Sequence, residues 1–179
     1  ISLTFLYIII ELVGLDEYGK FSLKITQFTL IASFCFGWIN QSQLRFESAN
    51  KSKKITLSID ILLVAVLLIL SVILYINFAG KNKFGNSNIL ISFFCISSIG
   101  FFSYYKTCLQ SNFFTRYILF LTIVQSVFFI SFPLILKNYM VLDGEYLVLC
   151  SSASFFAASL FLLIYNVKLL KFEKINFKK

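Results

Sequence analysis

Two carboxylates lie inside long apolar runs, and they are the side chains of this sequence best placed to carry out chemistry. Glu11 falls in the first run and Asp60 near the start of the third. Burying a charged side chain in a membrane costs roughly 3 kcal/mol unless it is paired or neutralised, which makes each carboxylate a candidate catalytic residue. A simpler interpretation also fits both. Asp60 lies about a turn and a half from Lys54, and Glu11 about one turn from Asp16, so each fits the headgroup level.

Several other kinds of site are not expected. The sequence contains no histidine, and no two cysteines have a metal-ligand spacing such as CxxC; the four are Cys35, Cys95, Cys108 and Cys150. We therefore expect no metal, no cofactor and no histidine-dependent catalysis, and interpret the cysteines as small buried hydrophobes. The net charge of +8 does not indicate nucleic-acid binding, because the basic residues stand between apolar runs instead of on a solvated face.

The elements that would position Glu11 and Asp60 are apolar runs. The chain of 179 residues is 59% hydrophobic and 13% charged, whereas soluble domains are about 45–50% apolar and about 25% charged. This predicts a single all-α integral membrane domain over residues 1–179, a bundle of about six transmembrane helices. The predicted spans are Ile1–Leu15, Phe21–Asn40, Ile55–Ala79, Ile89–Tyr105, Phe113–Leu136 and Tyr146–Leu170. The first is short for a span, which suggests that further residues precede Ile1.

The aromatic residues Trp38, Tyr104, Tyr105, Tyr139 and Tyr146 fall near predicted span ends, where amphipathic rings favour the interface.

The distribution of basic residues predicts the orientation. With six spans, one side holds both termini and 11 of the 16 Lys and Arg residues: Arg45, Lys51, Lys53, Lys54, Lys106, Arg116, Lys168, Lys171, Lys174, Lys178 and Lys179. The positive-inside rule places this side in the cytoplasm. Asp16, Glu17, Asp143 and Glu145 then face outward. Richness in Phe, Ile, Lys and Ser is typical of AT-rich genomes, which indicates a bacterium or an organelle as the source. We expect a multi-pass protein of a cell inner (cytoplasmic) membrane, with membrane lipids as partners.

Small residues form one face of the last predicted span. Ala153, Ala157 and Ser159 lie among further Ser and Ala residues. Small side chains let helix backbones approach closely, so we interpret this face as a helix-packing or oligomer seam, with a second copy or another protein as partner. A catalytic serine is disfavoured because no base is available to activate it.

The same run resembles the last signature of the lysoplasmalogenase family of polytopic membrane proteins. Ala153, Phe156, Ser159, Leu163 and Asn166 fall in step with that signature, although Leu160 stands where the family has an aspartate. The resemblance implies a membrane hydrolase that cleaves vinyl-ether lysolipids, with Glu11 and Asp60 as its acids.

Three functions follow from these patterns. The first is a non-catalytic membrane subunit or effector, since few charges lie within the spans. The second is a diverged lysoplasmalogenase-like hydrolase, which needs Glu11 and Asp60 to meet in one cavity. The third is a small-solute or ion transporter, which predicts broken helices at the membrane midplane. Loss of activity in Glu11→Gln with Asp60→Asn favours the enzyme, and loss only in Ser159→Leu favours assembly.

Overall fold

The computed structural model describes residues 2–46, 55–58, 66, 69–70, 89–139, 143–165 and 170–173. Its main elements are helices. They are α1 (Ser2–Val13), α2 (Leu15–Phe46), α4 (Ile89–Ser111), α5 (Thr115–Lys137) and α6 (Gly144–Tyr165), together with the short strands β1 (Ile55–Ser58) and β2 (Leu170–Glu173). Val66, Ile69 and Leu70 are also helical, and Ile69 is buried in the core.

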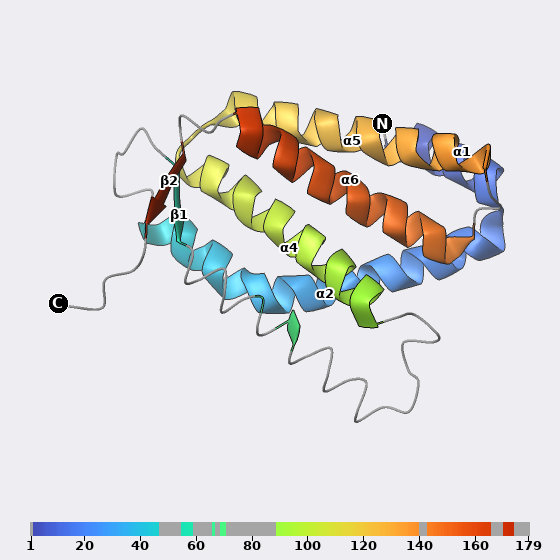
Figure 1. Cartoon of the computed structure of the whole chain (residues 1–179), viewed down its shortest axis with the longest axis horizontal. Coiled ribbons are helices and arrows are strands. Elements are labelled where there is room, and N and C mark those ends of the chain that lie inside the picture. The colour runs from blue at the N-terminus through green and yellow to red at the C-terminus, as the bar shows by residue number, and fades with distance from the viewer. Residues whose placement is uncertain are drawn as a thin grey trace.

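The long helices form a row in the order α2, α4, α6, α5 (Figure 1). α2, α4 and α6 run in one direction and α5 runs in the opposite direction. The end of the bundle at which α2 and α6 begin carries Asp16, Glu17, Asp143 and Glu145, and we call it the acidic end. The opposite end carries Arg45, Lys106 and Arg116, and we call it the basic end.

Within the described residues, three helices are long and apolar enough to cross a membrane: Leu15–Arg45 of α2, Thr115–Lys137 and Gly144–Phe161 of α6. The predicted helical fold is thus confirmed. The number of six spans stays a prediction, since α1 covers only 12 residues and the range Ile55–Ala79 lies mostly outside the described residues. The 32 residues of α2 extend about 48 Å at 1.5 Å per residue. That length exceeds a hydrocarbon core of ~30 Å, so α2 tilts in a bilayer or extends beyond it.

A single glycine separates α1 from α2. Gly14 has a φ of 92°, and its N–H donates to the carbonyl of Ile10 at 2.8 Å. This left-handed conformation favours glycine and ends a helix. The predicted spans Ile1–Leu15 and Phe21–Asn40 leave the first turn at Asp16, Glu17 and Gly19. That position is wrong, because the two acids lie in the first turn of α2, where carboxylates interact favourably with the helix dipole.

Two segments predicted as helical span ends are strands instead. β1 and β2 pair in parallel, with Ile55 opposite Leu170 and Ser58 opposite Glu173. The prediction that a helix begins at Ile55 is therefore wrong, as is its extension to Leu170. The reason is visible in the sequence: Ile-Thr-Leu-Ser and Leu-Lys-Phe-Glu both alternate apolar and polar residues, which is the period of a strand.

α4 lies at the centre of the bundle and packs on both α2 and α6. Tyr104 and Tyr105 are buried, although the sequence placed them at a membrane interface. The difference arises because α4 continues to Ser111, which places both tyrosines inside the helix instead of at its end. Trp38, Tyr139 and Tyr146 are exposed, as that interpretation expects.

Polar side chains join α2 to α4. The Asn40 amide donates to Ser103 Oγ at 3.0 Å, and the Gln43 amide donates to Cys108 Sγ at 3.6 Å. One turn before Asn40, the ring of Phe36 lies against Gly100. Because side chains four residues apart share a helix face, these contacts form one continuous seam.

Candidate functional site

The two predicted catalytic carboxylates are not brought together within the described residues. Glu11 lies on α1 and is exposed. Asp60 lies outside the described residues. The pairing of Glu11 with Asp60 in one cavity therefore stays a prediction, and the charged groups that the structure does bring together are different ones.

The first turn of α6 organises this charged region. Asp143 precedes the helix, and its Oδ1 accepts a hydrogen bond from the N–H of Tyr146 at 3.1 Å. This is the geometry of an N-cap, in which a short polar side chain satisfies an otherwise unpaired backbone donor. Glu145 stands in the same turn, where its charge interacts favourably with the positive end of the helix dipole.

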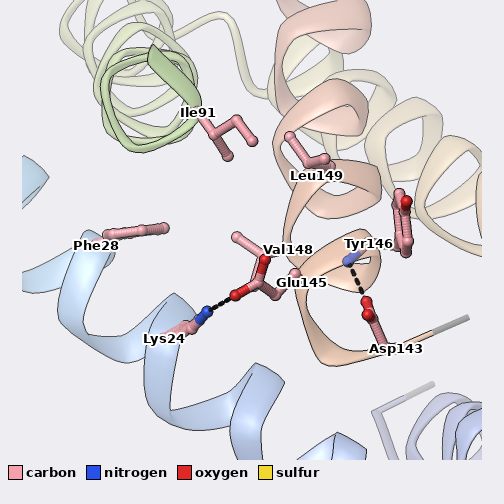
Figure 2. A pocket seen from close by; sticks show the side chains of 8 residues that line it. All are labelled: Lys24, Phe28, Ile91, Asp143, Glu145, Tyr146, Val148 and Leu149. Carbon is pink, nitrogen blue, oxygen red and sulfur yellow. Dashed lines mark hydrogen bonds and ion pairs between the residues drawn. The ribbon is translucent and has the colours of Figure 1, made fainter. Parts of the chain in front are cut away.

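Glu17 of α2 connects the two helices. Its Oε2 accepts a hydrogen bond from the backbone N–H of Gly144 at 2.8 Å, and its Oε1 forms an ion pair with Lys20 at 2.5 Å. One turn further along α2, Lys24 forms an ion pair with Oε1 of Glu145 at 2.5 Å (Figure 2). We call these contacts among Glu17, Lys20, Lys24, Gly144 and Glu145 the α2–α6 clasp.

A recess of about 180 Å³ lies beside the clasp, between α2, α4 and α6. Figure 2 shows that Lys24 points across it toward Glu145, while Asp143 turns back toward the start of α6. Apolar side chains from three helices form the rest of the wall. The lining residues are Lys24, Phe28, Ile91, Asp143, Glu145, Tyr146, Val148 and Leu149. The recess thus combines an ion-paired side with an apolar side.

The chemical capacity of this site is restricted by its own contacts. Glu17 and Glu145 are each engaged by a lysine, and Asp143 caps a helix. Carboxylates held in this way are poor general bases, because a proton acceptor has to reach the substrate. The arrangement is suited to holding α2 and α6 in register at the acidic end.

Sequence reasoning did not single out these residues as a site. The signal was nevertheless present. Glu17 and Glu145 are predicted to face outward, and Lys20 and Lys24 are not among the 11 basic residues predicted on the cytoplasmic side, so all four fall on one side of the membrane. Only the packing of α6 against α2 decides which of these charges meet.

The predicted seam residues lie on α6 where it packs against its neighbours. Ser159 is buried, and its hydroxyl donates to the carbonyl of Phe155 at 2.8 Å. Ala153 and Ala157 are half-buried. Nearby, Ser152 is also buried, and its hydroxyl donates to the carbonyl of Val148 at 2.8 Å. Contact between two copies through the same residues stays a prediction.

The cysteines do not form a cluster. Cys35, Cys95, Cys108 and Cys150 are all buried with free thiols. In the part of the chain that the structure describes, no three Cys, Asp or Glu residues lie together as metal ligands do.

Comparison with protein-family models, with curated proteins and with solved structures finds no match to this chain. The resemblance to the lysoplasmalogenase family stays a prediction that rests on the spacing of Ala153, Phe156, Ser159, Leu163 and Asn166.

Proposed function

We propose that this protein is a multi-pass integral protein of a cytoplasmic membrane, with both termini in the cytoplasm, and that it acts as a non-catalytic subunit or effector. Three described helices are long and apolar enough to span a bilayer. α2 and α6 run in one direction and α5 in the other (Figure 1), as the spans of a multi-pass protein do.

The surface of α5 supports an environment of lipid or of partner helices. Leu119, Ile123 and Val127 recur every four residues, and all three are exposed. Leu134 and Ile135 continue the exposed apolar surface, and the buried residues of this helix are only Leu121 and Pro133. A soluble protein rarely exposes so continuous an apolar surface.

The observation that carries the non-catalytic assignment is the α2–α6 clasp. The carboxylates that meet between these helices are occupied by lysines or by backbone donors of the same chain. Their contacts fix the relative position of two apolar helices, which is a structural role. The same pairing lowers the cost of placing the charges near a membrane interface.

The first experiment determines the orientation. A green fluorescent protein fused after Lys179 is expected to fluoresce in bacterial cells, and an alkaline phosphatase fused there is expected to be inactive. The reason is that the basic end, with Arg45, Lys106 and Arg116, should stay in the cytoplasm. As a control, the same reporters inserted after Lys137, at the acidic end, should give the opposite result. Active phosphatase at the C-terminus contradicts the proposed orientation.

A second experiment separates assembly from catalysis. We expect the double variant Glu11→Gln, Asp60→Asn to have the same oligomeric state as the wild type. We also expect the wild type not to cleave a vinyl-ether lysolipid. Ser159→Leu is expected to disrupt helix packing and to lower the stability of the protein by about 1–3 kcal/mol, because it adds volume at a buried site. Cross-linking in membranes and size-exclusion chromatography measure the assembly.

Two substitutions control for unspecific effects in the same helix. Ser159→Ala keeps the site small, and Phe161→Leu changes an exposed residue two positions away. Both should assemble as the wild type does. Lysolipid cleavage by the wild type that is lost in the Glu11→Gln, Asp60→Asn variant would instead establish the hydrolase and end the non-catalytic proposal.

A further inference from the structure

A second hollow lies between α5 and α6, and it shares Tyr146 and Leu149 with the recess beside the clasp. It is an open groove of about 500 Å³, and we call it the α5–α6 groove. Its walls are almost entirely apolar. The lining residues are Phe132, Ile135, Leu136, Tyr146, Leu149, Cys150 and Ala153. None of them takes part in the contacts of the α2–α6 clasp.

The spacing of the α6 residues explains the shape of the groove. Tyr146, Leu149, Cys150 and Ala153 follow one another at intervals of three, one and three, so they share one face of the helix. From Tyr146 to Ala153 this face extends about 10 Å along the helix axis. The small side chains of Cys150 and Ala153 leave the inner part of the face open. On the opposite wall the ring of Phe132 stacks on Phe128, with ring centroids 5.5 Å apart.

Polar side chains flank one end of the groove. At the acidic end Leu136 is followed by Lys137, which is exposed in the last turn of α5. None of the ion pairs among the described residues includes Lys137. Tyr146 stands at the same end and is 41% exposed, as an amphipathic ring at a membrane interface should be. Away from this end the walls offer only apolar atoms and the thiol of Cys150, which is 3% exposed.

We propose that the α5–α6 groove binds one acyl chain of a bilayer phospholipid, whose phosphate lies at the acidic end beside Lys137. This inference rests on the proposed membrane location. A cation and an amphipathic ring at one end, with an apolar trough beyond them, match the polarity of a phospholipid along its length. The outer wall of the groove belongs to α5. Only 11% of its span is buried, the lowest share among the three candidate spans, so lipid has access to the groove.

Packing energetics favour a lipid chain as the occupant. Apolar walls that face an empty space lose dispersion contacts, and an acyl chain restores them without burying a polar group. The chain is flexible and can follow an irregular surface between two helices. The ammonium group of Lys137 near the headgroup level attracts the negative charge of the lipid phosphate. A folded partner would need a protrusion of matching shape to reach Cys150 at the bottom of the groove.

The test is native mass spectrometry of the protein purified in mild detergent. We expect the wild type to retain one phospholipid per chain. Ala153→Phe fills the groove, so we expect the retained fraction to fall at least tenfold. Val127→Phe adds the same ring on the exposed surface of α5, outside the groove, and should retain lipid as the wild type does. Lys137→Gln should lower the retention of phosphatidylglycerol more than that of phosphatidylcholine.

A measurement on the wild type keeps the proposal falsifiable if Ala153→Phe fails to fold. A phospholipid with a diazirine in its acyl chain should label the α6 peptide that contains Leu149 and Cys150. Label confined to Leu119, Ile123 and Val127 would contradict lipid binding in the α5–α6 groove but would agree with the proposed membrane location. Efficient cross-linking of two copies through Cys150 overturns lipid binding in the groove in favour of self-association. Release of the wild-type protein from membranes by alkaline carbonate would instead overturn the proposed membrane location itself.

Discussion

Gly100→Ala is expected to push α2 away from α4 and to lower the stability of the protein by about 1–3 kcal/mol, the usual cost of adding volume to a packed core. A Cβ on Gly100 would overlap the ring of Phe36. Phe36 is 0% exposed, so its ring has no free space to enter. Small residues at such positions let membrane helices approach closely, and packing between the helices is a main source of helix association in membranes.

The effect should extend along the seam between the two helices. The hydrogen bond from Asn40 to Ser103 lies one turn from Phe36 and depends on the same close approach. The thermal midpoint in detergent measures the change, at roughly 2–4 °C per kcal/mol for a protein of this size. Gly37→Ala is the matched control, because a Cβ there meets no atom within 4 Å. Alanine in a helix interior is favourable by roughly 0.5–1 kcal/mol relative to glycine, so this variant should be as stable as the wild type or more so. Equal midpoints for both alanine variants would show that Phe36 adapts to the added methyl group.

Gly144→Ala is expected to open the α2–α6 clasp, again at a cost of about 1–3 kcal/mol. A Cβ at this position would lie 2.8 Å from the backbone oxygen of Glu17 and 3.2 Å from the backbone nitrogen of Phe21. Backbone atoms inside a helix cannot rotate away, so the start of α6 has to move. That movement breaks the hydrogen bond from the Gly144 N–H to Glu17.

Hydrogen exchange at the first turn of α6 gives the most direct readout. Opening of the clasp should accelerate exchange of the amides of Gly144 and Tyr146 in Gly144→Ala. The control is Gly19→Ala, on the same part of α2, where an added Cβ meets nothing within 4 Å. Its exchange rates should match those of the wild type. Unchanged exchange and stability in Gly144→Ala would mean that the clasp does not hold α6 in position.

The sequence alone determined the class of fold and the chemistry that is not expected of this protein. Long apolar runs with few charges favour helices, which satisfy their own backbone hydrogen bonds. Both ends of α5 and the start of α6 were therefore predictable to within two residues, whereas α2 extends six residues beyond the predicted Phe21–Asn40 at each end. The sequence contains no histidine, so histidine-dependent catalysis is not expected, and no structure is needed for that conclusion. Local patterns could also have identified β1 and β2, because their apolar and polar residues alternate.

Only the tertiary structure decided which residues meet. The break between α1 and α2 lies at Gly14, because Gly14 adopts a positive φ. The sequence does not show which of its glycines adopts this conformation. Lys24 meets Glu145 across 121 positions of sequence separation, a contact that depends on the position of α6 relative to α2. Tyr104 and Tyr105 are buried because α4 lies between two other helices. A periodic pattern determines that a helix forms, whereas its neighbours determine which of its faces is buried, and that information resides in the packing of side chains that are distant in sequence.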